Sequence, residues 1–147
     1  MKRPSRTATR IATAGTAVAL ALVSLLPSGQ GRLAGWDAAL SPSLQNLLHV
    51  PAYAVLTVLA ALAASSAPRA GAGLLIGAAL ACSVFGAALE YFQTIIPGRT
   101  GSAMDAGLNA VGAAVGAVVV AVWQRGCPRR RRDAATSGTT KERLRAR

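Results

Sequence analysis

Carboxylate, guanidinium and amide side chains gather in one short segment of this chain, residues 90–105. The segment contains Glu90 and Asp105, two of only five acidic residues in the sequence, together with Arg99. An ionisable residue inside an apolar membrane segment is costly and indicates a functional site. A guanidinium grips a carboxylate or a phosphate through two parallel hydrogen bonds. These residue types favour anion binding or acid–base chemistry.

Polar residues recur at helical spacing in this segment and in its apolar neighbours. Residues three, four or seven apart lie on one face of a helix. Such faces are formed by His49 and Tyr53, by Gly86, Glu90 and Gln93, and by Asp105, Asn109, Gly112 and Gly116. The expected ligand-binding residues are Arg99, Glu90, Asp105, His49, Tyr53, Gln93 and Asn109, and the candidates for acid–base catalysis are His49 and Glu90.

Four apolar segments, at about 11–26, 47–67, 71–96 and 103–123, position these residues. Hydrophobic residues form 52% of the 147-residue chain, and its mean hydropathy is +0.42. A backbone in lipid must satisfy its own hydrogen bonds, so each segment is predicted to be a helix. Because the alternating pattern of barrel strands is missing, we expect an all-α integral membrane protein with four transmembrane helices.

Basic residues concentrate near the two ends of the chain, which has a formal net charge of +11. Flanks rich in Lys and Arg stay in the cytoplasm, so we expect both termini there and outer loops at 30–46 and 97–102. The predicted parts are a basic N-terminus at 1–10, a membrane domain at 11–124 and a basic disordered tail at 125–147. A nucleic-acid binder would spread cations over one folded face, so no nucleic-acid partner is expected.

The first apolar segment has a second interpretation. A basic start followed by a short apolar run also fits a secretory signal covering about residues 1–29. We expect a retained helix, because no convincing small-x-small cleavage site follows Leu26. The other three spans keep the same orientation under either interpretation.

The polar residues also have a purely architectural explanation. Ser102 and Asp105 match a capping box at the start of the last segment. Glu90 fits such an explanation least, because its carboxylate needs a proton or a partner in a membrane helix, and Arg99 is the natural partner. The residues that can serve helix packing or the membrane interface are Gln93, Asn109, His49, Tyr53, Gly73, Gly77, Gly112 and Gly116.

Sequence spacing predicts no metal site and no cofactor. Cys82 lies inside a span and Cys127 at a span's cytoplasmic edge, so no disulfide between them is expected. Neither cysteine has neighbours at metal-ligand spacing. The sequence also shows no nucleophile motif and no glycine loop of the kind that cradles phosphates.

One ordered series of residues carries a resemblance to a known family. The series is His49, Tyr53, Glu90, Gln93, Pro97, Gly98, Arg99, Ser102, Asp105, Asn109, Gly112 and Gly116. In order and spacing it resembles the VanZ-like family, named for a protein linked to teicoplanin resistance, over about residues 45–122. Two positions depart from the family pattern: Gln45-Asn46, where many members have an acidic residue and Lys, and Leu89, where many have Asp. The resemblance implies a multi-span protein of the bacterial envelope.

Three functions remain open at this stage. In the first, an extracytoplasmic polar pocket binds an anionic lipid-linked envelope component, such as a cell-wall precursor, or a glycopeptide-related ligand. Arg99 would hold the anion, and Glu90 and Asp105 would orient Arg99. In the second, His49 and Glu90 perform acid–base chemistry on such a substrate. In the third, the polar residues only hold the helices together. Membrane lipids are expected partners in the plasma membrane, and a homo-oligomer stays open.

Overall fold

The computed structural model describes residues 5–26, 41–65 and 69–126, and this part of the chain is all-helical. Its helices are α1 (Arg6–Leu25), α3 (Pro42–Ala64), α4 (Ala72–Gln93) and α5 (Ala103–Gly126). All four are long and apolar enough to cross a membrane. The predicted all-α fold with four membrane helices is therefore confirmed. The ends of the chain, at 1–4 and 127–147, lie outside the described residues, as do Cys127 and most of the expected tail.

Helix caps move two boundaries away from the limits of the apolar runs. The side chain of Ser5 accepts a hydrogen bond from the N–H of Ala8, so α1 begins about a turn before the apolar run. Ser41 accepts from the N–H of Leu44, with Pro42 in the first turn of α3. Residues 42–46, expected in an outer loop, are therefore helical, and 27–40 lie outside the described part of the chain.

The connection between α4 and α5 begins earlier than expected. The helix ends at Gln93 and tightens into a turn, in which the N–H groups of residues 94–96 bond to carbonyls three residues back. Gly98 then takes a positive φ of 78°, a conformation that glycine adopts at no steric cost. The chain reaches α5 at Ala103.

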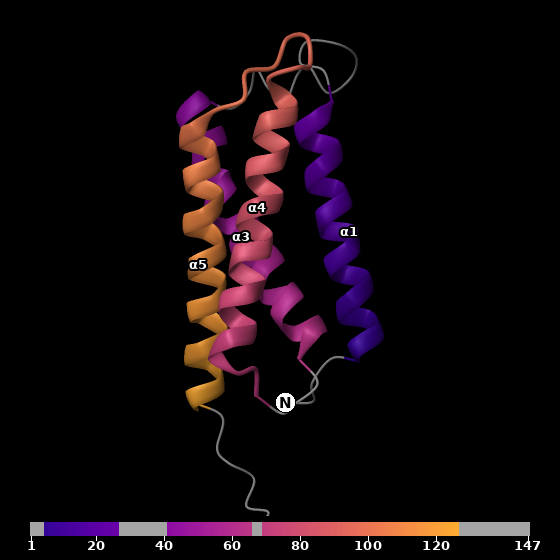
Figure 1. The fold of residues 1–147 in the computed structure, drawn as a ribbon, viewed down its shortest axis with the longest axis vertical. Helices are drawn as coiled ribbons and strands as arrows, with labels where there is room; N and C mark the ends of the chain where they lie inside the picture. Colours follow the sequence, from indigo (N-terminus) through magenta and orange to yellow (C-terminus); the bar gives the residue numbers. More distant parts are fainter. Residues whose placement is uncertain (1–4, 27–40, 66–68, 127–147) are drawn as a thin grey trace, which may run out of the picture.

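The four helices run alternately up and down the long axis, so the start of α1 and the end of α5 lie at the same end of the bundle (Figure 1). The closest backbone approach joins α3 and α5. A Cβ added at Gly112 or Gly116 would collide with the carbonyl oxygen of Val50 or Ala54, respectively. The Gly112 and Gly116 pair thus serves close packing, as its spacing suggested. Gly73 and Gly77 of α4 instead face open space.

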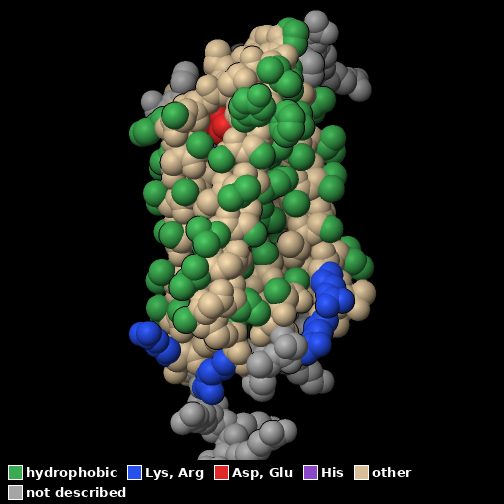
Figure 2. Space-filling model, viewed as in Figure 1, with side chains coloured by type: hydrophobic (Ala, Val, Ile, Leu, Met, Phe, Trp, Pro, Cys, Tyr) green, Lys and Arg blue, Asp and Glu red, His purple; other side chains and the backbone are tan. Residues whose placement is uncertain are grey.

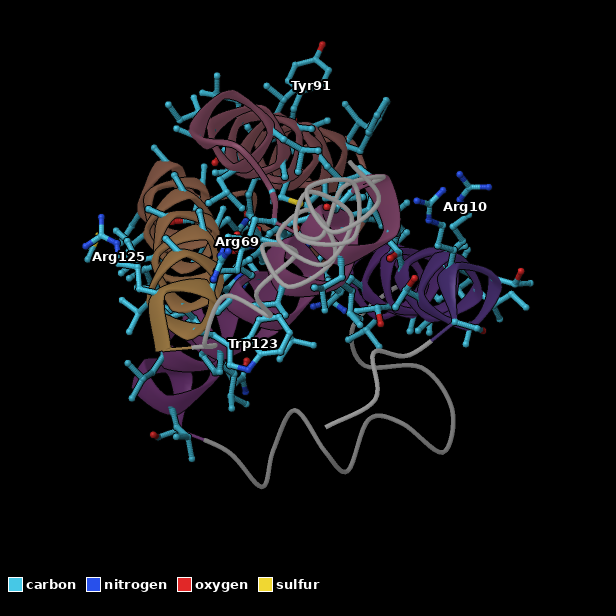
Figure 3. The ribbon with its side chains drawn as sticks, turned by 90° about the horizontal axis from the view of Figure 1, so that it is seen from below. Arg10, Arg69, Tyr91, Trp123 and Arg125 are labelled. Carbon is cyan, nitrogen blue, oxygen red and sulfur yellow. The ribbon has the colours of Figure 1, made fainter. Side chains whose placement is uncertain are left out.

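The surface matches a multi-pass membrane protein. Large apolar side chains are exposed on every helix, and on the face in Figure 2 they cover the middle of the molecule. Basic side chains on this face lie at its lower end, and an acidic one shows near the upper end. Seen from below, Arg10 and Arg125 point outward from α1 and α5 (Figure 3). The cytoplasmic assignment of this lower end, and retention of α1, stay predictions.

Candidate functional site

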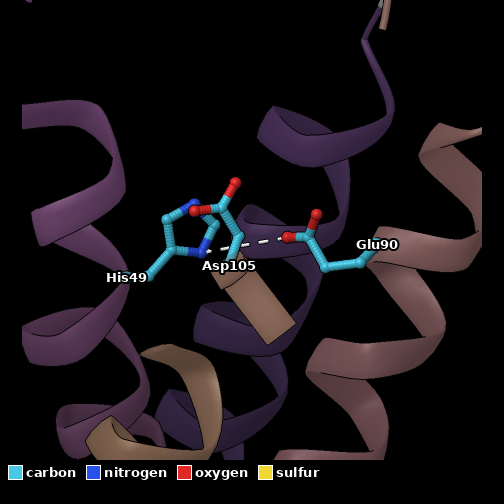
Figure 4. Close-up of side chains that lie close together, drawn as sticks. All are labelled: His49, Glu90 and Asp105. Carbon is cyan, nitrogen blue, oxygen red and sulfur yellow. Dashed lines mark ion pairs between the residues drawn. The ribbon is translucent and has the colours of Figure 1, made fainter. Parts of the chain in front are cut away.

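Three ionisable side chains from three helices meet near the upper end of the bundle. His49 comes from α3, Glu90 from α4 and Asp105 from α5. One ring nitrogen and one oxygen of each carboxylate lie within 4.8 Å of one another. Figure 4 shows the three side chains pointing toward a common region. We call these residues, together with Asn109, the polar cluster.

Two contacts orient the imidazole of His49. Its Nδ1 lies 2.7 Å from Oδ1 of Asn109 and 4.0 Å from Oε1 of Glu90. In the tautomer with the proton on Nδ1, this nitrogen donates to the amide oxygen and Nε2 carries the lone pair. Nδ2 of Asn109 is buried without a partner within the described residues. The His49 side chain is 25% exposed and that of Glu90 is 6% exposed. The imidazole can therefore be reached from outside, whereas the Glu90 carboxylate is enclosed.

The second oxygen of Glu90 binds the backbone at the start of α5. Its Oε2 accepts a 3.1 Å hydrogen bond from the N–H of Ser102. This contact requires the connection to lie close over α4, and Gly101 permits it, because a Cβ there would collide with the Glu90 carbonyl oxygen. Glu90 is therefore held at Oε2 by the start of α5, and its Oε1 faces His49.

Asp105 confirms one half of the predicted capping box. The hydroxyl of Ser102 accepts a 3.3 Å hydrogen bond from the N–H of Asp105, as an N-cap side chain does. In a complete box, the Asp105 carboxylate would accept from the N–H of Ser102, but Glu90 occupies that donor. Oδ1 of Asp105 is buried and has no hydrogen-bond partner within the described residues.

A tightly packed layer, which includes Asn109, lies one helical turn below the three ionisable side chains. Asn109 is fully buried and Tyr53 is 3% exposed. Both lie beside Gly86 of α4, where an added Cβ would approach the Tyr53 ring and the Asn109 side chain to 2.8 Å. The Tyr53 ring also packs against Phe85, with ring centroids 6.5 Å apart. The missing side chain at Gly86 lets α3 and α5 converge on α4 beneath the ionisable groups.

The structure corrects the expected pairing of Arg99 with Glu90. Arg99 donates from Nε to the carbonyl of Leu26, at 2.9 Å, and from Nη2 to that of Val23, at 2.8 Å. Gln93 donates to the carbonyl of Ser24 at 3.1 Å. The last carbonyls of a helix lack intrahelical donors, and a cation there complements the helix dipole. Arg99 and Gln93 therefore hold the end of α1, and their roles in ligand binding stay predictions.

The bundle as a whole matches a family model. The model of VanZ/LLP1 matches residues 4–124, which include all four described helices except the last two residues of α5. The chain belongs to the VanZ/LLP1 family. This confirms the resemblance found in residues 45–122 and extends it to α1. No curated protein and no solved structure matches the chain.

In this VanZ/LLP1 protein, the structure brings together His49, Glu90 and Asp105, which were among the expected ligand-binding residues. The sequence did not reveal that these three groups could ligate a metal. Metal-ligand motifs are recognised by short spacing along the chain, whereas His49, Glu90 and Asp105 come from separate helices. The available signal was that all three lie toward the same end of the bundle, Glu90 near the end of α4 and the other two in the first half of their helices. The arrangement can hold a proton between an imidazole and a carboxylate, or hold a cation among all three groups.

Proposed function

We propose that this VanZ/LLP1 protein acts on an anionic, lipid-linked component of the bacterial cell envelope by acid–base chemistry at the polar cluster. The site would face the extracytoplasmic side of the plasma membrane. The observation that carries the proposal is the double contact of His49 Nδ1, 2.7 Å from Asn109 Oδ1 and 4.0 Å from Glu90 Oε1. A histidine oriented in this way by groups from two other helices resembles a positioned general base.

Acid–base chemistry accounts for the geometry better than an anion grip by Arg99. Two donor groups of Arg99 are engaged with carbonyls of α1. The polar cluster itself presents two carboxylates, which do not attract the charged group of an anionic ligand but suit proton transfer at a neutral group of the substrate, or a cation. A binding role for a glycopeptide-related ligand therefore ranks second.

Each member of the cluster has a defined part in the proposed chemistry. Asn109 keeps the proton on Nδ1, so Nε2 of His49 accepts a proton from a hydroxyl of the substrate or from water. The resulting imidazolium is stabilised by Glu90, whose Oε1 faces Nδ1. The N–H of Ser102 in turn fixes the Glu90 carboxylate through Oε2.

The depth of the cluster suits a substrate that stays in the membrane. Glu90 lies three residues before the end of α4, which corresponds to about 4.5 Å at the rise of an α-helix. The cluster would therefore lie at the level where headgroups meet hydrocarbon. A lipid-linked substrate can place its polar group there while its chain remains among the lipids.

The proposal is tested in a deletion strain complemented with His49→Gln or Glu90→Gln. The readouts are sensitivity to envelope stress and to glycopeptides, mass spectrometry of the lipid extract, and immunoblots of the membrane fraction. Both variants should lose complementation at normal membrane levels, and a lipid-linked substrate should accumulate in both. The matched control is Thr57→Val, because Thr57 is buried in the same helix as His49 but outside the cluster.

Full complementation by both cluster variants would remove the chemical role and leave a packing role. Lost complementation without any change in the lipid extract would favour the binding role. The control variant should complement fully, since valine has the shape of threonine and the Thr57 hydroxyl has no partner within the described residues.

A further inference from the structure

We propose that the polar cluster is a binding site for a divalent transition-metal cation, held by His49, Glu90 and Asp105. One ligand atom from each residue lies within 4.8 Å of the others. An imidazole and two carboxylates form a donor set that suits Zn²⁺ and related ions. The inference deepens the proposed function and changes one role in it: with a cation bound, Nε2 of His49 would be a ligand, and the cation would supply a Lewis acid that activates water in place of the imidazole. The role of the cation rests on the proposed function, whereas cation binding itself is measured independently of it.

Charge balance is the first argument. Glu90 and Asp105 bring two carboxylates close together at the end of a membrane bundle, where two negative charges repel and are poorly solvated. Arg99, which the sequence offered as the counter-ion, donates to α1 instead. Within the described residues, Nδ1 of His49 approaches Glu90 to 4.0 Å, and this contact is an ion pair only when the imidazole is protonated. A divalent cation would neutralise both carboxylates while the imidazole stays neutral.

The buried oxygen of Asp105 is the second and independent argument. A residue in this position of a capping box normally uses its carboxylate on the N-cap N–H. Here Glu90 holds the N–H of Ser102, and Oδ1 of Asp105 is buried without a partner in the described part of the chain. Buried carboxylate oxygens that find no donor are expected to bind a cation or a proton. Asp105 is thus available as a ligand in a way that an ordinary cap residue is not.

The contact between His49 and Asn109 is the third argument. Histidines that ligate metals usually donate their other ring N–H to an oxygen acceptor, which fixes the tautomer. Asn109 Oδ1, 2.7 Å from Nδ1, provides such an acceptor and leaves the lone pair of Nε2 for a cation. Asn109 is fully buried, so this orientation is built into the packing between α3 and α5.

The chain is well suited to a direct test, because it contains a single histidine. Full-length protein is purified in detergent with a tag free of histidine, from a background in which Cys82 and Cys127 are replaced by alanine. After treatment with a chelator, binding of Zn²⁺ is measured by calorimetry and by elemental analysis. Co²⁺ serves as a spectroscopic probe, and Cu²⁺ reports in pulsed electron resonance whether an imidazole nitrogen is coordinated.

The cysteine-free parent should bind one Zn²⁺ per chain. Asp105→Asn and Glu90→Gln keep the side-chain shapes, and each should weaken binding by about 10–100-fold or more. His49→Gln should abolish the imidazole signal of bound Cu²⁺. Asp133→Asn, which changes a carboxylate remote in the sequence, should bind like the parent. Thermal unfolding of each variant in chelator identifies any variant that has lost its fold.

Three results would overturn the inference: a folded parent that binds no Zn²⁺ at micromolar concentration, unchanged affinity in Asp105→Asn and Glu90→Gln, or a Cu²⁺ spectrum without coordinated nitrogen. These results test the metal site separately from the proposed function. Variants that lose complementation while the parent binds no metal would leave the acid–base function standing without a cation. Metal binding combined with full complementation by those variants would leave the metal site standing and remove the proposed function.

Discussion

At the residue scale, Gly101 decides how closely the connection after α4 lies over the polar cluster. Its backbone passes so near the carbonyl of Glu90 that a methyl group at Gly101 would collide with that oxygen and with the side chain of Thr94. The next residue, Ser102, supplies both the N–H that holds Glu90 and the hydroxyl that caps α5. Because Gly101 has no side chain, the connection lies close enough for Ser102 to join the end of α4 to the start of α5.

We predict that Gly101→Ala destabilises the bundle by about 1–3 kcal/mol, because the connection must move away from backbone atoms rather than from a flexible side chain. The measurement is thermal unfolding in detergent, followed by the Zn²⁺ titration, in which affinity should also fall. Gly107→Ala is the matched control. Gly107 lies in α5 with open space around it, so alanine should be neutral or stabilise by up to about 1 kcal/mol. Equal stability of the two variants would contradict this account of Gly101.

Individual residues were easier to identify from the sequence than their partners. Glu90 stood out because a carboxylate in an apolar helix is costly, and the structure places it beside His49. Its contact with Ser102 was not predictable, because a backbone N–H leaves no mark in a sequence. Arg99 was assigned to Glu90 on chemical grounds, whereas the end of α1 offers it two carbonyls.

At the scale of the elements, α1 is attached to the bundle by apolar packing in its middle and by polar contacts at its upper end. Ala17 and Leu20 pack against the core around Tyr53 and Cys82, but most of the helix is exposed. Near the upper end, α1 receives hydrogen bonds from Gln93 and Arg99. Arg99 and Gln93, two of the seven residues that sequence analysis assigned to ligand binding, therefore also position a helix.

Arg99→Lys should loosen the last turn of α1. Arginine reaches the carbonyls of Val23 and Leu26 with two different nitrogens, whereas lysine has a single ammonium and no planar fork. Hydrogen bonds from charged groups contribute about 1.5–3 kcal/mol, so hydrogen exchange of residues 22–26 should accelerate by about tenfold or more. The control is Arg125→Lys, at an exposed position in the last turn of α5. Unchanged exchange in Arg99→Lys would show that these contacts do not hold the helix.

Helices were predictable as elements, whereas their ends and their packing partners were only partly so. Apolar length identified all four spans, but Ser5 and Ser41 extend α1 and α3 through side-chain caps beyond the apolar runs. Gly112 and Gly73 begin identical small-residue spacings. Gly112 contacts the backbone of α3, and Gly73 faces open space. Spacing alone does not say which face of a helix meets a neighbour.

At the scale of the whole molecule, the two ends of the bundle differ in chemistry. The polar cluster occupies the end that includes the connection from α4 to α5, and Arg10, Arg69 and Arg125 lie toward the other end (Figures 1 and 3). Because basic flanks stay in the cytoplasm, we expect the cluster to face the outside. The orientation decides from which side of the membrane the proposed substrate would reach the cluster.

We predict that Thr100→Cys reacts with a membrane-impermeant thiol reagent in intact cells, in a background lacking the native cysteines. Thr100 is exposed in the connection between α4 and α5. Gly71→Cys is the matched probe for the opposite end, since Gly71 is exposed at the start of α4 with open space around it. It should react only after the cells are permeabilised. The reverse labelling pattern would show the opposite membrane orientation, with the cluster on the cytoplasmic side.

The contact between His49 and Asn109 spans 60 residues of sequence, and this has a consequence for biosynthesis. The third and last of the helices that form the cluster, α5, is also the last to leave the ribosome. Until α5 arrives, His49 and Glu90 stand at the rim of the membrane without Asn109 and without the N–H of Ser102. A chain interrupted before α5 therefore leaves the polar groups of His49 and Glu90 without these partners. We expect membrane proteases to recognise such an unfinished chain by its unpaired polar groups.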